Sequence, residues 1–137
     1  MADSFRVGIH DVPAVSGLGP DQGWVGMTVQ FLVDSAEAGA EHVVVGRALF
    51  APGHSEHQWH RHPGAEEFAL IVRGQGIVLD GDNEIPVSAG DVVFHRKGAW
   101  HGFRNTSSSE EAEMLWGWAG AASRAEAGYE LRYPPKR

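Results

Sequence analysis

Two histidines stand two residues apart in the segment 60–67, HRHPGAEE, and two carboxylates close the segment. Residues i and i+2 of a β-strand point to the same face, so His60 and His62 would direct two imidazole nitrogens toward one point. The Pro-Gly pair favours a turn that folds the chain back toward them. Either Glu66 or Glu67 could then add a carboxylate. Imidazole and carboxylate together suit a divalent transition metal, so this segment predicts a metal site.

Histidine is concentrated around this segment. Six of the eight histidines lie between His54 and His101, and His101 is the candidate for a fourth ligand. The metal does not require His54, His57 or His95. One of them could act as an acid or base, since an imidazole titrates near neutrality. We favour His95, which lies in an apolar strand, although a single histidine is more often only hydrogen-bonded or exposed.

Length and composition restrict the class of protein. A chain of 137 residues, 42% of them hydrophobic, predicts one folded domain. A net charge of −7 without a basic cluster argues against binding nucleic acid or an anionic membrane. The absence of cysteine excludes disulfides, thiolate catalysis and iron–sulfur clusters. No apolar stretch has the length of a signal peptide or membrane span, so we expect a soluble, cytoplasmic protein.

The elements that must position these residues are predicted to be strands. Short apolar runs bounded by turn residues, in a chain with 18 glycines and seven prolines, indicate an all-β fold. An irregular arm is expected over 1–23, a loop over 34–41, and a short helix over 123–130 with Ser123 as its N-cap. About ten short strands indicate a closed barrel or jelly roll. The clearest predicted strands cover 25–33, 42–51, 67–72, 77–79, 92–95, 100–103 and 114–118.

The strand over 67–72 is apolar on both faces. Phe68, Leu70 and Val72 alternate with Ala69 and Ile71. Such a strand needs cover on each side. The domain's own core supplies one cover, and the N-terminal arm or a second subunit would supply the other. We expect a homodimer.

Two groups of residues resemble the motifs of the cupin family. The first motif is matched by Gly53, His60, His62, Glu67 and Gly74, with one residue more than usual after Gly53. The second is matched by Gly90, Gly98, His101 and Asn105, with Arg96 in place of the usual proline. The first motif also resembles its germin version.

The resemblance covers about residues 40 to 120. It implies a jelly-roll β-barrel with one divalent metal (Fe, Mn, Ni, Zn or Cu) held inside by His60, His62, Glu67 and His101. It thereby selects Glu67 over Glu66. The proline position occupied by Arg96 is not a ligand position, so the implied metal site is unaffected.

Strand alternation predicts the walls of this site. If His60 faces inward, Gln58 should do so too, while Trp59 and Arg61 face away. Gln58 could contact a substrate or be a solvated residue at the barrel mouth. By the same alternation Phe103 shares the inward face of His101.

The last clear strand places Met114, Trp116 and Trp118 on one face. Core packing is their ordinary role, but this strand often lines the pocket in the family that the motifs resemble. An apolar, aromatic pocket beside a metal favours a small, partly apolar or aromatic substrate.

The function expected from these residues is metal-dependent catalysis on a small organic molecule, most simply by an oxygenase or a lyase. In it the four ligands hold the ion, and His95 or Gln58 orients the substrate or moves a proton. The alternatives are a non-catalytic cupin that binds a carboxylate or hormone-like molecule, and an isomerase or polyketide-type cyclase. An effector-sensing module is less favoured because no helix-turn-helix region accompanies the barrel.

Overall fold

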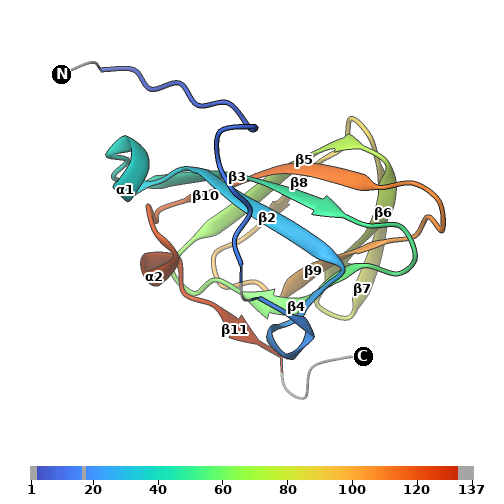
Figure 1. Ribbon diagram of the computed structural model, residues 1–137. Helices are drawn as coiled ribbons and strands as arrows, with labels where there is room; N and C mark the ends of the chain where they lie inside the picture. Colours follow the sequence, from blue (N-terminus) through green and yellow to red (C-terminus); the bar gives the residue numbers. More distant parts are fainter. Residues whose placement is uncertain (1–2, 17, 133–137) are drawn as a thin grey trace.

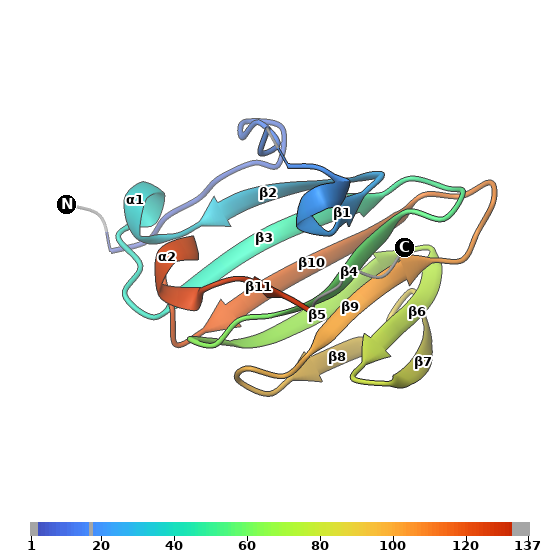
Figure 2. The same cartoon turned by 90° about the horizontal axis from the view of Figure 1, so that it is seen from below.

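The computed structural model describes residues 3–16 and 18–132 as two antiparallel sheets that face each other (Figures 1 and 2). One sheet has the order β1 (Trp24–Val25), β4 (Glu56–Arg61), β9 (His101–Asn105), β6 (Gln75–Asp80), β7 (Asn83–Ser88), with β11 (Glu130–Leu131) also paired to β4. The other has the order β2 (Met27–Val33), β3 (Val43–Phe50), β10 (Ala112–Ala119), β5 (Glu66–Arg73), β8 (Val92–His95). The all-β jelly-roll prediction is confirmed.

The helical elements are short: η1 (Pro20–Gln22), α1 (Ser35–Ala38) and α2 (Arg124–Ala127). None of the described helices is long and apolar enough to cross a membrane. The predicted helix near 123–130 forms as α2, with the Ser123 hydroxyl accepting from the Glu126 amide at 3.1 Å. The prediction of a loop over 34–41 is wrong, because Asp34 caps α1 by accepting from the Glu37 amide at 2.8 Å. Figures 1 and 2 show both helices at the same end of the barrel.

The core lies between the two sheets. On β3 every second residue is buried, so the alternation of the strand turns Val44, Ala48 and Phe50 inward. The ring of Phe50 meets that of Phe103 on the opposite sheet, with centroids 4.7 Å apart. This contact joins the sheets at the core and leaves the neighbouring interior for the site described below.

The N-terminal arm covers the outer face of β2. The Gln30 amide donates to the carbonyl oxygens of Ile9 and Val12, each at 2.7 Å, and the Val15 amide donates to the Val29 carbonyl at 2.8 Å. Strand β2 is at the opposite edge of its sheet from β8. The arm therefore leaves the outer faces of β5 and β8 uncovered.

Asn105 fixes the end of β9 and should be a major source of stability. Its side chain is buried and donates to the carbonyl oxygens of Phe50, Ala51 and Glu110, while its own oxygen accepts from the Ser107 amide. Asn105→Ala would leave these backbone groups without a partner inside the protein. We expect a loss of about 2–4 kcal/mol in the free energy of unfolding, measured by urea denaturation.

The neighbouring exposed Thr106 gives the control. Thr106→Ala should change the free energy of unfolding by no more than about 0.5 kcal/mol. Equal effects of the two substitutions would show that the Asn105 hydrogen bonds do not stabilise the barrel.

Candidate metal centre

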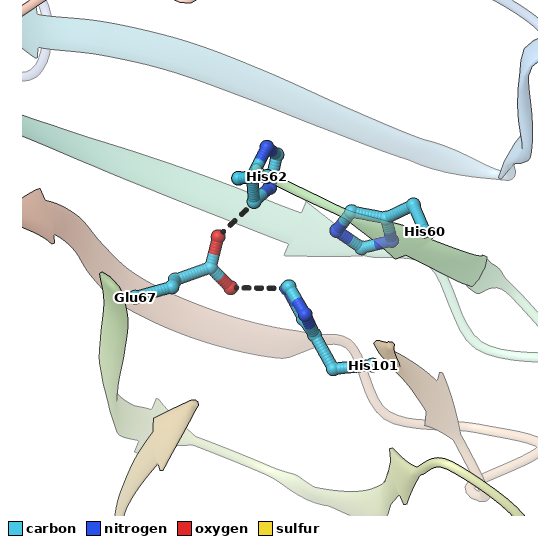
Figure 3. Close-up of side chains that lie close together, drawn as sticks. All are labelled: His60, His62, Glu67 and His101. Atoms are coloured by element: carbon cyan, nitrogen blue, oxygen red, sulfur yellow. Dashed lines mark ion pairs between the residues drawn. The ribbon is translucent and has the colours of Figure 1, made fainter. Parts of the chain in front are cut away.

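Four side chains from both sheets converge inside the barrel (Figure 3). His60 lies on β4, His62 directly follows β4, His101 begins β9, and Glu67 lies on β5 in the facing sheet. One ligand atom from each residue can be chosen so that all four lie within 4.8 Å of one another. Glu66, the alternative that residue spacing allowed, is exposed. The predicted metal-binding cluster of three histidines and Glu67 is thus confirmed.

The backbone sets the tautomer of all three histidines. Each Nδ1 lies within hydrogen-bond distance of a carbonyl oxygen: His60 of Gln58 at 2.7 Å, His62 of Gly128 at 2.8 Å, and His101 of Ala99 at 2.9 Å. A carbonyl only accepts, so each Nδ1 must carry the proton. In the neutral rings each Nε2 then carries the lone pair that a metal binds.

The distances at Glu67 fit an ion held between these groups. His62 Nε2 lies 3.2 Å from Glu67 Oε1, and His101 Nε2 lies 3.0 Å from Glu67 Oε2. Ligands about 2.1 Å from a metal and at right angles are about 3 Å apart. His101 Nε2 is buried and makes no hydrogen bond in spite of its short distance to the carboxylate. A lone pair on Nε2 and a carboxylate that face each other call for a positive charge between them, either a proton or a metal ion, and a donor set of three imidazoles and one carboxylate fits a divalent metal.

The charges in the cluster depend on one another. Burial alone would raise the pKa of Glu67, but His101 and His62 outweigh burial and hold that pKa well below its usual value. Burial lowers the pKa of His60 well below its usual value. For His101, burial acts in the same direction, but the charge of Glu67 outweighs it and raises the pKa. When His101 is protonated it forms an ion pair with Glu67, and a metal that binds here must displace that proton.

Trp118 holds the carboxylate ligand in place. Its indole N–H donates to Glu67 Oε1 at 2.9 Å, and the register of β10 with β5 sets Trp118 directly opposite Glu67. The sequence predicts Trp118 as a core residue or as a wall of the pocket. This hydrogen bond adds a second task, which is to fix the orientation of a metal ligand.

The C-terminal segment reaches the cluster through backbone. Besides the Gly128 carbonyl bonded to His62, β11 pairs with β4 at His60 and Arg61. Gly64 packs so tightly beneath this segment that a Cβ there would lie 2.0 Å from the Glu126 carbonyl oxygen. The ligand segment and the C-terminal segment therefore hold each other in position.

A cavity of about 350 Å³ opens beside the cluster, and its wall includes the four ligands. Of the other residues predicted for the site, His95, Phe103, Met114, Trp116 and Trp118 line it, whereas Gln58 does not. His95 stacks on His101 with ring centroids 4.1 Å apart, and burial lowers the pKa of His95 to about 4. The roles expected of these wall residues stay predictions.

Strand β4 departs from the simple alternation that the sequence predicts. Its pairing with β9 shifts between His57 and His60, so these two rings stack at 3.6 Å on the cavity side. The Gln58 side chain is instead buried away from the cavity. Its contribution to the site is its backbone carbonyl, which accepts a hydrogen bond from His60 Nδ1. Trp59 faces away as expected and donates to the Gly81 carbonyl. Burial lowers the pKa of His57 to about 3.

Sequence reasoning does not identify Tyr129 and Arg124, two polar side chains of the cavity wall. Tyr129 donates its hydroxyl to the Gln22 carbonyl at 2.6 Å and accepts from the Trp24 indole at 3.0 Å. The same hydroxyl lies 3.0 Å from His57 Nε2, and burial raises the pKa of Tyr129. Arg124 of α2 also lines the cavity. Tyr129 is 107, 105 and 72 residues from Gln22, Trp24 and His57 in the sequence, so only the fold brings these groups together.

The indole of Trp118 should strengthen metal binding through Glu67. Trp118→Phe removes the N–H but retains an aromatic ring, so we expect the protein to bind Zn²⁺ about tenfold to hundredfold more weakly. Competition with a chromophoric chelator measures this affinity.

Trp116 supplies the matched control. It also lines the cavity, but its indole N–H is buried and makes no hydrogen bond. Trp116→Phe should leave the Zn²⁺ affinity within about threefold of the wild type. If both variants bind Zn²⁺ as the wild type does, the hydrogen bond to Glu67 does not support the metal.

Comparisons with known proteins agree with this geometry. The chain is 35% identical over 51 residues to an oxalate-binding protein of Thermotoga maritima, a match that spans 37% of this chain and 42% of that protein. Among solved structures, a predicted oxalate decarboxylase of the same organism is 26% identical with a TM-score of 0.66, covering 79% of this chain and 90% of the other.

The polyketide cyclase RemF of Streptomyces resistomycificus shares the fold at 21% identity, with a TM-score of 0.70 over 85% of this chain and 79% of that chain. The family model described as the cupin domain matches residues 46–118, a span that contains all four cluster residues. The chain belongs to the cupin family.

Proposed function

We propose that this protein is a metal-dependent enzyme, an oxygenase or a lyase, that acts on a small organic acid. The observation that carries the proposal is the set of three Nε2 atoms and one carboxylate at the wall of a cavity. A metal bound there would supply Lewis-acid chemistry toward an oxygen of the bound molecule. The two Thermotoga maritima proteins, whose names refer to oxalate, support an acid as the ligand.

The residues around the cluster would orient the bound acid. His95 stands opposite Glu67 in the pairing of β5 with β8 and lines the cavity. A neutral imidazole has one donor and one acceptor nitrogen, so His95 can hold an acid group or pass a proton to it. Gln58 would act through the carbonyl that holds His60. The buried aromatic walls would exclude water from the reacting groups.

A second candidate is a binding protein without turnover. The curated relative of 35% identity is named for binding oxalate, although only part of each chain is matched. In that case the metal would hold the carboxylate of the ligand and no reaction would take place. Isomerase or polyketide-type cyclase chemistry is a third candidate, which rests on the fold alone.

Metal analysis combined with turnover assays tests the enzyme proposal. The protein as purified should carry about one equivalent of a transition metal, and His101→Ala should carry none, because a site with one ligand fewer binds far more weakly. Substrate-dependent O₂ uptake by the iron form would identify an oxygenase, and release of CO₂ without O₂ uptake would identify a lyase.

The contrary results are equally clear. Stoichiometric metal in the His101→Ala variant would refute the assigned site. Tight binding of small acids by the wild type, without turnover under any metal, would identify a binding protein instead.

We also propose that the protein forms a homodimer through the outer faces of β5, β8 and β10. Leu70 lies beside Leu115 and Val92 in the strand register, and Phe68 lies beside Phe94. With Val72, these side chains are between 39% and 70% exposed. They present on the order of 500 Å² of apolar surface, in the upper part of the range of roughly 300–600 Å² for the largest patch of a monomer and more than half of the roughly 800 Å² that each partner buries in a standard interface.

A charge on this face should break the dimer. Phe94→Lys places an ammonium group within the apolar surface, so we expect a dimeric wild type and a monomeric variant in light scattering after size exclusion. Thr28→Lys, at an exposed position of β2 on the far edge of the same sheet, should stay dimeric. A monomeric wild type would refute the proposal.

A further inference from the structure

The cavity is larger than a ligand held only by the cluster needs. Its volume of about 350 Å³ equals roughly twelve water molecules at about 30 Å³ each. Oxalate, which consists of two linked carboxyl groups, would leave most of this space unfilled. Most of the wall beyond the ligands and the other histidines is apolar. Its aromatic and aliphatic members include Val29, Phe31, Ala48, Phe50, Met114 and Trp116.

An apolar wall of this extent favours an occupant with an apolar body. Covering such surface is favourable by about 25 cal/mol for each Å² removed from water. Flat rings suit it well, because Phe31, Trp116 and Trp118 already meet at centroid distances of 5.1 to 5.8 Å. The unpartnered indole N–H of Trp116 would pair with an oxygen on the body of the ligand.

Arg124 is the single lysine or arginine among the described residues that line the cavity. It is exposed, and its guanidinium carbon lies 5.4 Å from the centroid of the Phe31 ring, which itself lines the cavity. Within the described chain it has no carboxylate partner, whereas the five arginines 47, 61, 73, 104 and 132 each form an ion pair. A free cation at the cavity of a protein with a net charge of −7 is suited to an anion.

We propose that the cavity takes an aromatic acid that spans these features. Chelating oxygens at one end would reach the metal cluster, the ring would lie against the apolar wall, and a carboxylate at the other end would meet Arg124. The inference rests on the proposed function, since it needs a metal at the cluster. It adds the class of substrate: an aryl carboxylate that also carries metal-binding oxygens.

Three probes separate the contributions of chelation, ring and carboxylate. Oxalate chelates without a ring, catechol chelates through a ring, and 3,4-dihydroxybenzoate is catechol with a carboxylate added on the far side of the ring. Each is titrated by calorimetry into the Zn²⁺-loaded protein, because Zn²⁺ does not oxidise catechols. We expect catechol to bind at least about tenfold more tightly than oxalate, and the carboxylate to add a further fivefold to tenfold.

The Arg124→Gln variant tests the cation. The advantage of 3,4-dihydroxybenzoate over catechol should fall to about twofold or less, and the affinity for catechol should not change. Arg96→Gln is the matched control. Arg96 is exposed and lies outside the cavity wall, and its substitution by glutamine removes the same charge as Arg124→Gln. It should retain the full advantage.

The failures can be told apart. If oxalate binds as tightly as the ring compounds, or if Arg124→Gln keeps the carboxylate advantage, the aromatic-acid inference is overturned while the metal-dependent function stands. If none of the probes binds more tightly with Zn²⁺ than without it, both are overturned.

Discussion

The structure depends on one electrostatic requirement, which is that the buried carboxylate of Glu67 must face positive charge. Three imidazoles surround it, and each is fixed by a carbonyl on its Nδ1 so that its Nε2 turns inward. Those carbonyls belong to three separate parts of the chain: β4 itself, the turn before β9, and the C-terminal segment after α2. The ligands also come from both sheets. An ion at this point would therefore join the two sheets and the C-terminal segment, so metal affinity and the order of that segment are coupled.

The sequence reveals the four ligands because their spacing matches strand geometry and the cupin motifs. His60 and His62 follow from two-residue alternation, while Glu67 and His101 needed the motif spacing. The position of His57 could not be predicted, since the bulge that turns it beside His60 leaves no local pattern. The hydrogen bond between His62 and the Gly128 carbonyl could not be predicted either. Every residue has a backbone carbonyl, and only the fold determines which of them lies beside His62. Strand alternation therefore predicts on which face of a sheet a side chain lies, and irregular backbone such as the bulge in β4 produces the exceptions.

The fold shows the same division between local and long-range causes. The jelly roll and α2 could be predicted because alternation and an N-cap serine are local signals. The short helix α1 was missed, although Asp34 followed by Glu37 resembles the signal that identified α2, because the surrounding alanine and glycine favoured a loop. The sequence does not decide whether the arm or a second subunit covers the outer face of β5. The arm binds β2 through Gln30, a contact between residues about twenty positions apart that no strand pattern encodes.

Two glycines in the middle of one sheet determine what each of its faces can bind. At Gly46 a Cβ would lie 2.1 Å from the Trp116 ring, so only glycine lets this indole lie over β3 as a wall of the cavity. At Gly117 a Cβ would lie 2.4 Å from the Phe68 ring. The absence of a side chain at Gly117 therefore lets Phe68 lie across β10 on the outer, apolar face of the sheet. The four cluster residues lie within the span that the family model matches, whereas these two glycines act on the walls around them. The two glycines thereby set which aromatic side chain lies over the inner face, where it lines the cavity, and which lies over the outer face.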